Sequence, residues 1–285
     1  MGFNKNQYSK LNFVVAGQPE STPAPGGTLA GLRHALDIGC DGMEIEWVHQ
    51  VAINPKTAKE VKALKQKSGC ALTAHGPYFI NLNSRDDAVV EKSIGRILKT
   101  ARMGSMAGCT SFTFHAAFLM GDDRATVHRQ VVSILRDIQK IIVKEQLEIK
   151  MRPELTGKES SWGRLEELLD LSQSVKGIEP CVDWAHLHAR TLGKFNSRDE
   201  FIAVIRDYIS ALGENSLNDM HMHITGIVYT QKGEKHHLPI RESDFKYKEL
   251  LRVLKEFDVK GVAVAESPIL EKDTLMLKRS YRQMK

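Results

Sequence analysis

Histidine and acidic residues stand at the ends of short apolar runs along this chain or in the loops that follow, and seven of its eleven histidines belong to this set. Imidazole and carboxylate groups are ligands that Zn, Mn and Fe ions take in proteins. Carboxylates buried close together would be strongly disfavoured, because like charges repel and desolvation is costly, and a cation removes that objection. The sequence therefore predicts a metal site with ligands for more than one ion. The candidate ligands are His75, His115, Glu154, Asp183, His186, His221, His223, Glu234, His236, His237 and Glu266.

Several of these residues have an ordinary structural explanation when they are taken singly. The D-x-x-H pattern at 183–186 is common by chance, and the histidine pair at 236–237 could be solvated. His221 and His223, by contrast, flank one residue of a predicted strand, so both point to the same side of it. Two imidazoles without partners in a dry interior would be unfavourable. Taken jointly, the set favours a metal site.

The scaffold that must position these residues consists of eight short apolar runs that alternate with longer amphipathic stretches. The runs are rich in Val, Ile and Phe, or short and apolar between turn residues, as buried parallel strands are. In the stretch 125–145, Val127, Val131 and Leu135 recur at helical spacing, which predicts an amphipathic helix. The predicted strands are 11–16, 42–47, 71–75, 111–115, 148–154, 179–183, 219–225 and 261–266.

Eight successive strand–helix units predict an α/β fold, the (β/α)8 or TIM barrel, which takes about 250 residues as one domain. We therefore expect a single TIM-barrel domain over residues 1–285. An open doubly wound sheet is the alternative, but no G-x-G-x-x-G follows the first run, which argues against its dinucleotide-binding form. In a barrel the C-terminal strand ends and the loops after them form one mouth, so the candidate ligands should converge there.

The composition is that of an ordinary soluble globular protein, with 42% hydrophobic and 26% charged residues. A formal charge of +5 is compatible with a nucleic-acid partner and does not demand one. The cysteines at 40, 70, 109 and 181 show no C-x-x-C spacing, so we expect them to be reduced and buried in a cytoplasmic protein. The N-terminus has no apolar signal region, and no run approaches 18 apolar residues, so we expect neither export nor a membrane partner.

An ordered series of motifs resembles that of the endonuclease IV family, which belongs to the xylose-isomerase-like barrels. The motifs are TAHGPYFINLNS, FTFHAAF, PELTG, CVDWAHLHAR, MHMHITG, GEKHHLP and AES. The resemblance covers nearly the whole chain, from about residue 40 to 270. It is specific because HGPYFINL, the D-x-x-H and the late glutamate occur together, whereas each alone is weak.

The resemblance implies three metal ions per chain, usually Zn2+, with Mn2+ acceptable in one site. It assigns His75 and His115 to the first ion and makes Glu154 a bridge between the first and second ions. Asp183, one histidine of the strand 219–225 and Glu266 would complete the second site.

The third ion would be held by His186, Glu234 and His236. The family has an aspartate where this chain has Glu234. A longer acid can pair with a shifted histidine, so His237 is the alternative to His236.

A further departure concerns the strand 219–225. The family has one histidine there, and this chain has His221 and His223. Alignment to the following loop favours His221, whereas the turn H-I-T-G after the strand favours His223. We prefer His221 and keep both as candidates.

The activity that the resemblance implies is hydrolysis of the phosphodiester 5′ to an abasic site in double-stranded DNA, as in base excision repair, by a monomeric enzyme. Metal ions can lower the pKa of a bound water to about 7. Glu154 would keep two ions close together, and Glu266 would orient the nucleophile, so these two are the expected catalytic residues.

Four residues are expected to contact the DNA. An enzyme that reaches a damaged sugar within a duplex must bend the DNA and fill the gap. Tyr78 and Phe79, just after His75, resemble the family's wedge of an aromatic and an apolar residue, although plain packing under the loop would also explain them. Lys158 and Arg190 are the candidates for phosphate contacts.

Two other functions remain open. A sugar isomerase or epimerase on the same barrel needs one metal ion, held by Glu154, Asp183, a histidine of the strand 219–225 and Glu266, and all four are present. The remaining histidines are then surplus, so metal stoichiometry discriminates. A non-catalytic binder of abasic DNA would show affinity that depends on salt, without cleavage.

Overall fold

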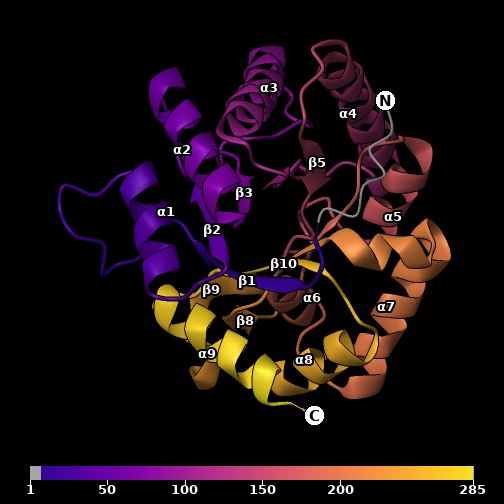
Figure 1. Ribbon diagram of the computed structural model, residues 1–285. Helices are drawn as coiled ribbons and strands as arrows, with labels where there is room; N and C mark the ends of the chain where they lie inside the picture. The colour runs from indigo at the N-terminus through magenta and orange to yellow at the C-terminus, as the bar shows by residue number, and fades with distance from the viewer. Residues whose placement is uncertain (1–7, 285) are drawn as a thin grey trace.

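The computed structural model describes residues 8–284. Residues 1–7 and residue 285 lie outside the described part, and with them the N-terminal residues in which we expected no export signal. Eight parallel strands form a barrel, and helices surround it (Figure 1). Around the sheet the strands follow the order β5-β4-β3-β2-β1-β10-β7-β6. They are β1 Leu11–Ala16, β2 Gly42–Glu46, β3 Ala71–His75, β4 Ser111–Phe114, β5 Lys150–Pro153, β6 Cys181–Asp183, β7 Met220–His223 and β10 Gly261–Ala265.

The barrel closes between β5 and β6. Met151 bridges Ile178 in parallel, and Glu154, just past β5, bridges Cys181. The amide of Leu155 donates to the carbonyl of Cys181 at 3.0 Å. The predicted (β/α)8 barrel is therefore confirmed.

The helices bury their apolar faces against the strands. In α4, the side chain of Asp123 accepts the N-cap hydrogen bond from the amide of Thr126. Val127, Val131 and Leu135 are fully buried, as their spacing predicts. No helix within residues 8–284 is both long and apolar enough to cross a membrane. The helices are α1 Thr28–Asp37, α2 Pro55–Ser68, α3 Asp87–Ala107, α4 Arg124–Lys144, α5 Leu165–Ser174, α6 Trp184–Arg190, α7 Arg198–Leu212, α8 Tyr247–Glu256 and α9 Glu271–Gln283.

The short helix α6 follows β6 without a loop. Asp183 is both the last residue of β6 and the N-cap of α6, and its Oδ1 accepts from the amide of His186 at 2.6 Å. The cap fixes where the first turn of α6 begins. It therefore places the His186 side chain next to the carboxylate that caps it.

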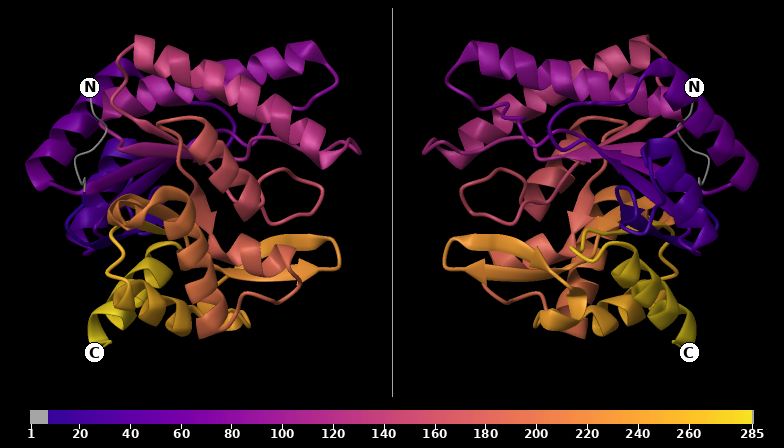
Figure 2. Two further views of the ribbon diagram at one scale, coloured as in Figure 1. Left: turned by 90° about the vertical axis from the view of Figure 1, so that its right-hand side faces the viewer. Right: turned by 90° about the vertical axis from the view of Figure 1, so that its left-hand side faces the viewer.

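The segment after β7 was expected to be a loop, and this expectation is wrong. It forms an antiparallel hairpin of β8 (Gly226–Thr230) and β9 (Gly233–Leu238), which extends from the barrel in Figure 2. The run GIVYT before the turn at 231–232 is rich in strand-forming residues and was overlooked, whereas GEKHHL is polar and shows no apolar alternation from which a strand could be predicted. Tertiary packing holds it, because Ile227 is buried against Ala185 and Ala189 of α6.

Candidate metal centre

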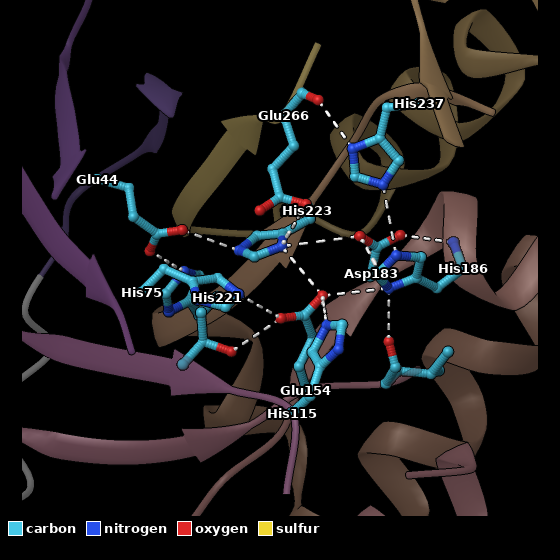
Figure 3. Close-up of polar contacts among 12 residues, drawn as sticks. Glu44, His75, His115, Glu154, Asp183, His186, His221, His223, His237 and Glu266 are labelled. Carbon is cyan, nitrogen blue, oxygen red and sulfur yellow. Dashed lines mark hydrogen bonds and ion pairs between the residues drawn. The ribbon is translucent and has the colours of Figure 1, made fainter. Parts of the chain in front are cut away.

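Three groups of ligand side chains meet at the barrel mouth (Figure 3), and in each group one ligand atom per residue lies within 4.8 Å of the others. The first group contains His75 at the end of β3, His115 after β4 and Glu154 after β5. Nε2 of His75 is 3.1 Å from Oε2 of Glu154, and Nε2 of His115 is 3.2 Å from Oε1. Glu154 therefore lies between two imidazoles that come from different strands.

The second group contains Glu154, Asp183, His223 and Glu266. Nδ1 of His223 lies 3.4 Å from Oε1 of Glu154 and 3.7 Å from Oδ2 of Asp183. It lies 3.2 Å from Oε2 of Glu266. One ring nitrogen thus faces three carboxylates, and Glu154 is shared with the first group.

The third group contains Asp183, His186 and His237. Nδ1 of His186 lies 3.0 Å from the carbonyl oxygen of Leu155, and Nδ1 of His237 lies 3.0 Å from that of Glu266. A carbonyl only accepts, so in the neutral ring each Nδ1 carries the hydrogen and each Nε2 has the lone pair. These two Nε2 atoms face each other at 3.4 Å, an arrangement that a cation between them would satisfy.

Glu234 of the hairpin approaches the third group, with Oε2 at 3.5 Å from Nε2 of His186. Gly157 makes this approach feasible. A Cβ atom on Gly157 would lie 2.6 Å from Cβ of Glu234 and 3.0 Å from Cδ2 of His186. The Gly157 carbonyl also accepts from the amide of Glu234 at 2.9 Å, so this glycine joins the hairpin to the mouth.

Unpartnered buried atoms test whether these residues suit metal ions. Oε1 of Glu154, Oδ2 of Asp183 and Nδ1 of His223 are buried and lack a hydrogen-bond partner. A buried polar atom without a partner destabilises a fold by about 1–3 kcal/mol. All three atoms converge on the second group, so the donor set fits a cation there. Oxygen and imidazole nitrogen donors of this kind suit Zn2+ or Mn2+.

The pKa values of the same residues in the metal-free protein also indicate a site suited to cations. Burial alone would raise the pKa of Glu154, but His115 and His223 outweigh it and hold that pKa well below its usual range. Burial is likewise outweighed at Glu266, whose pKa falls to about 2 beside His223. Burial would lower the pKa of His75, yet Glu154 and other carboxylates raise it to about 10. Protons on the imidazoles thus balance the carboxylates where cations would otherwise do so.

Within each of the two pairs of alternative histidines, the structure places one residue in a ligand group and the other outside the three groups. His223 lies in the second group, whereas His221 lies deeper, with Nδ1 3.0 Å from Oγ of Ser111. The geometry therefore favours His223 over the preferred His221. In the hairpin, His237 reaches the third group and His236 is exposed, so His237 is favoured.

A bulge in the hairpin explains the choice of His237. Tyr229 pairs with Glu234 and Val228 with His236, which leaves Lys235 as an extra residue in β9. In a regular strand, residues two apart share a face, and one extra residue shifts this alternation. Glu234 and His237, three residues apart, can therefore both face the mouth.

Three residues near the mouth were missed in the sequence. Glu44 and Glu46 of β2 lie with Glu266 in a further group of carboxylates, and Cys181 lies beside the two histidines of β7. Burial raises the pKa of Glu46 to about 8. The available signal was the run G-M-E-I-E, in which two acids share one face of a strand. All four cysteines are buried and unpaired, as expected.

The four candidate DNA contacts fall into two classes. Tyr78 and Phe79 are 49% and 57% exposed, so plain packing under the loop does not explain them. The Tyr78 ring centre is 5.4 Å from that of His75, which places it beside the candidate metal ligands. Lys158 is exposed on the loop after β5.

The expectation that Arg190 contacts phosphates is wrong. Its side chain is buried, and its guanidinium donates to the carbonyls of Lys158 and Ser161. Desolvation lowers the pKa of Arg190 to about 10. The residue holds the loop after β5 from the interior, and its guanidinium also lies beside the carboxylate of Glu159.

Comparison with known proteins agrees with this architecture. The family model described as xylose isomerase-like TIM barrel matches residues 32–283. An uncharacterised protein of Methanocaldococcus jannaschii is 33% identical over 279 residues, which cover 98% of this chain and 100% of that protein. A probable endonuclease 4 of Streptomyces avermitilis is 26% identical over 112 residues, 37% of this chain and 36% of that protein. The inferred resemblance to endonuclease IV is thereby confirmed.

Two solved structures match equally well, each with a TM-score of 0.71 and 18% identity. A D-tagatose 3-epimerase-like protein matches 95% of this chain and 96% of its own. Endonuclease IV from Thermus thermophilus matches 94% of this chain and 99% of its own. At this identity they establish the fold, and they do not choose between the activities they are named for.

Proposed function

The chain belongs to the xylose isomerase-like TIM barrel family, and we propose that it is a metal-dependent endonuclease that hydrolyses the phosphodiester 5′ to an abasic site in double-stranded DNA. The observation that carries the proposal is the set of three adjoining ligand groups, in which Glu154 and Asp183 are each shared by two. Sugar isomerisation on one ion needs only the second group. His75, His115 and the third group are surplus to that reaction and fit a site for about three ions.

Zn2+ is the proposed cofactor, and when bound the ions would activate water and neutralise charge on the phosphate. Glu154 would hold the first two positions at a fixed spacing, since its Oε2 faces His75 of the first group and its Oε1 faces His223 of the second. Glu266 has a pKa near 2 and so is ionised at neutral pH. It can accept a hydrogen bond from the attacking water and orient it.

The rim of the mouth suits a long substrate better than a free sugar. Tyr78 and Phe79 project beside the ligands of the first group, where they could enter the gap left by a missing base. Lys158, on the loop after β5, lies near Glu234 of the hairpin and adds to the effect of His186 and other histidines, which lower the pKa of that carboxyl against burial. Its exposed ammonium could contact a phosphate.

The test combines metal analysis with cleavage of a duplex that holds one synthetic abasic site. We expect about three ions per chain and a nick 5′ to the lesion that leaves a 3′-hydroxyl. The matched control is Glu154→Gln, which keeps the shape and removes the shared charge, and it should not cleave. One ion per chain and no nick would reject the proposal. Three ions with binding but no nick would indicate the non-catalytic binder.

The second candidate is a single-ion sugar epimerase. It is favoured by the completeness of the second group, in which His223 faces Glu154, Asp183 and Glu266, and by the epimerase-like structures of similar fold. Two glutamates across one ion could move a proton between substrate carbons. Conversion of a ketose with one ion per chain would select this function.

A further inference from the structure

A buried carboxylate lies beneath the metal centre, on a strand that the proposed function does not use. Glu44 of β2 is 0% exposed and lies in the interior of the barrel (Figure 3). Its Oε2 accepts from the hydroxyl of Thr73 at 2.7 Å. Nε2 of His221 lies 2.9 Å from Oε2, and Nε2 of His223 lies 3.0 Å from Oε1. Two imidazoles of β7 thus turn their Nε2 atoms towards one carboxylate.

The two nitrogens of His223 have different surroundings. Nε2 faces Glu44, whereas Nδ1 faces Glu154, Glu266 and Asp183 of the second group. A neutral imidazole carries one hydrogen, and an ionised carboxylate can only accept. With an ion at Nδ1, where three carboxylates meet, the lone pair of the neutral ring lies on Nδ1 and its hydrogen belongs on Nε2, next to Glu44.

His221 completes this arrangement. Its Nδ1 lies 3.0 Å from Oγ of Ser111, which can donate to it, and its Nε2 can then carry a hydrogen towards Glu44. Glu44 thus has three donor groups around it, one from Thr73 and two from β7.

The contacts between Glu44 and the two rings are close but not well aligned. Nε2 of both histidines and Oε1 of Glu44 are buried atoms without a hydrogen-bond partner of good geometry. The His223 ring therefore lies between Glu44 and the second group, and neither its Nε2 nor its Nδ1 makes a well-aligned hydrogen bond. An ion at Nδ1 and Glu44 at Nε2 would hold the ring from opposite edges, as carboxylate–histidine–metal arrangements do.

We infer that Glu44 is a positioning residue, which keeps the hydrogen of His223 on Nε2 and so directs Nδ1 to the ion of the second group. The inference rests on the proposed metal centre and does not depend on which reaction the centre performs. It gives the acid of β2 a role and explains why β7 carries two histidines. His221 holds Glu44, and His223 binds the ion.

Histidine nitrogen NMR on the wild-type protein tests the inference directly. The protein is loaded with an NMR-active cadmium isotope and labelled with nitrogen-15. We expect coupling of cadmium to Nδ1 of His223 and a hydrogen on its Nε2. Coupling to Nε2, or an ion held between Glu44, His221 and Cys181, would overturn the inference and leave the metal centre standing. A protein that binds no ion would overturn both.

Glu44→Gln gives a second test. Glutamine keeps the shape but offers one acceptor and one donor group to two N–H groups, so one ring must lose its partner. Loss of an outer carboxylate partner typically weakens metal affinity about 10–100-fold. We expect the ion of the second group to be lost first in dialysis against a chelator.

Thr73→Val is the graded comparison, because it removes one hydrogen bond to Glu44 and leaves the charge of that carboxylate in place. It should weaken ion affinity less than Glu44→Gln does, and thermal unfolding of both metal-free variants reports any general damage. Equal ion affinity in Glu44→Gln and the wild type would show that Glu44 does not position His223.

Discussion

Nδ1 of His223 lies 3.4 Å from Oε1 of Glu154, and both atoms are buried without a hydrogen-bond partner. Glu154 comes from the end of β5 and His223 from the end of β7, on either side of β6. Two such atoms are brought together by closure of the barrel, and a cation between them would satisfy both. Glu154 also faces His75 and His115, so its removal should affect two ion positions.

We therefore expect Glu154→Gln to lose about two ions per chain, whereas His75→Asn should lose about one. The physical reason is that Glu154 belongs to the first and second groups, and His75 only to the first. Elemental analysis after exhaustive dialysis measures the difference. Equal losses in the two variants would contradict the sharing of Glu154.

Adjacent histidines of β9 should behave differently. His237→Asn should lose the ion of the third group, because Nε2 of His237 faces Nε2 of His186. His236→Asn changes an exposed residue on the same strand and should retain all ions. The comparison is made by elemental analysis and by the chelator concentration that removes each ion. The opposite pattern would place the ligand at His236.

Gly157→Ala should displace the hairpin. Its Cβ would lie 2.6 Å from Cβ of Glu234, so β9 must move away from His186. We expect weaker binding of the third ion with the other two retained. Gly95→Ala in α3 is the control, since nothing lies within 4 Å of its Cβ, and it should change stability by no more than about 1 kcal/mol. Unchanged ion affinity in Gly157→Ala would show that the hairpin tolerates the shift.

Metal binding should release protons at neutral pH. In the metal-free protein the pKa of His75 is about 10, and the pKa values of His186 and His223 lie well above the usual 6.5, because nearby carboxylates, preceded at His223 by Cys181, outweigh burial. Ligation needs the neutral ring, so about three protons should leave on full loading. Calorimetry in buffers of different ionisation enthalpy counts them, and no proton release would contradict these directions.

The raised pKa of His75 also determines how the stability of the metal-free protein changes with pH. The pKa of His75 is raised by folding, so the proton stabilises the metal-free protein fully below about pH 6.5. This contribution is lost as the pH rises through about 10. We expect the unfolding temperature of the metal-free protein to fall over that range, and the fall to be smaller in His75→Asn.

The exposed pair after β3 should contribute to DNA binding and little to stability. Tyr78 and Phe79 are 49% and 57% exposed, so replacing both with alanine removes little buried surface. We expect affinity for an abasic duplex to fall about tenfold or more, which is about 1.4 kcal/mol. Val143→Ala in α4, 54% exposed on another part of the surface, is the control. Unchanged affinity in the double variant would reject the wedge.

The sequence by itself determined the barrel and the gathering of ligands at its mouth. Strand and helix periods are local properties, and residues such as His75 and Asp183 stand at predicted strand ends that the structure reproduces. Once eight parallel strands close, all their C-terminal ends face one way. Convergence of these residues then follows from topology, without knowledge of any side-chain packing.

Only the tertiary structure decided which residue of each ambiguous pair faces the site. The depth of His221 and His223 in the barrel depends on how β7 is staggered against its neighbours. The choice of His237 depends on a bulge that packing of the hairpin on α6 sustains. Arg190 is buried because the loop after β5 folds over it. Stagger, bulges and loop closure arise from contacts between distant segments, so local sequence patterns do not encode them.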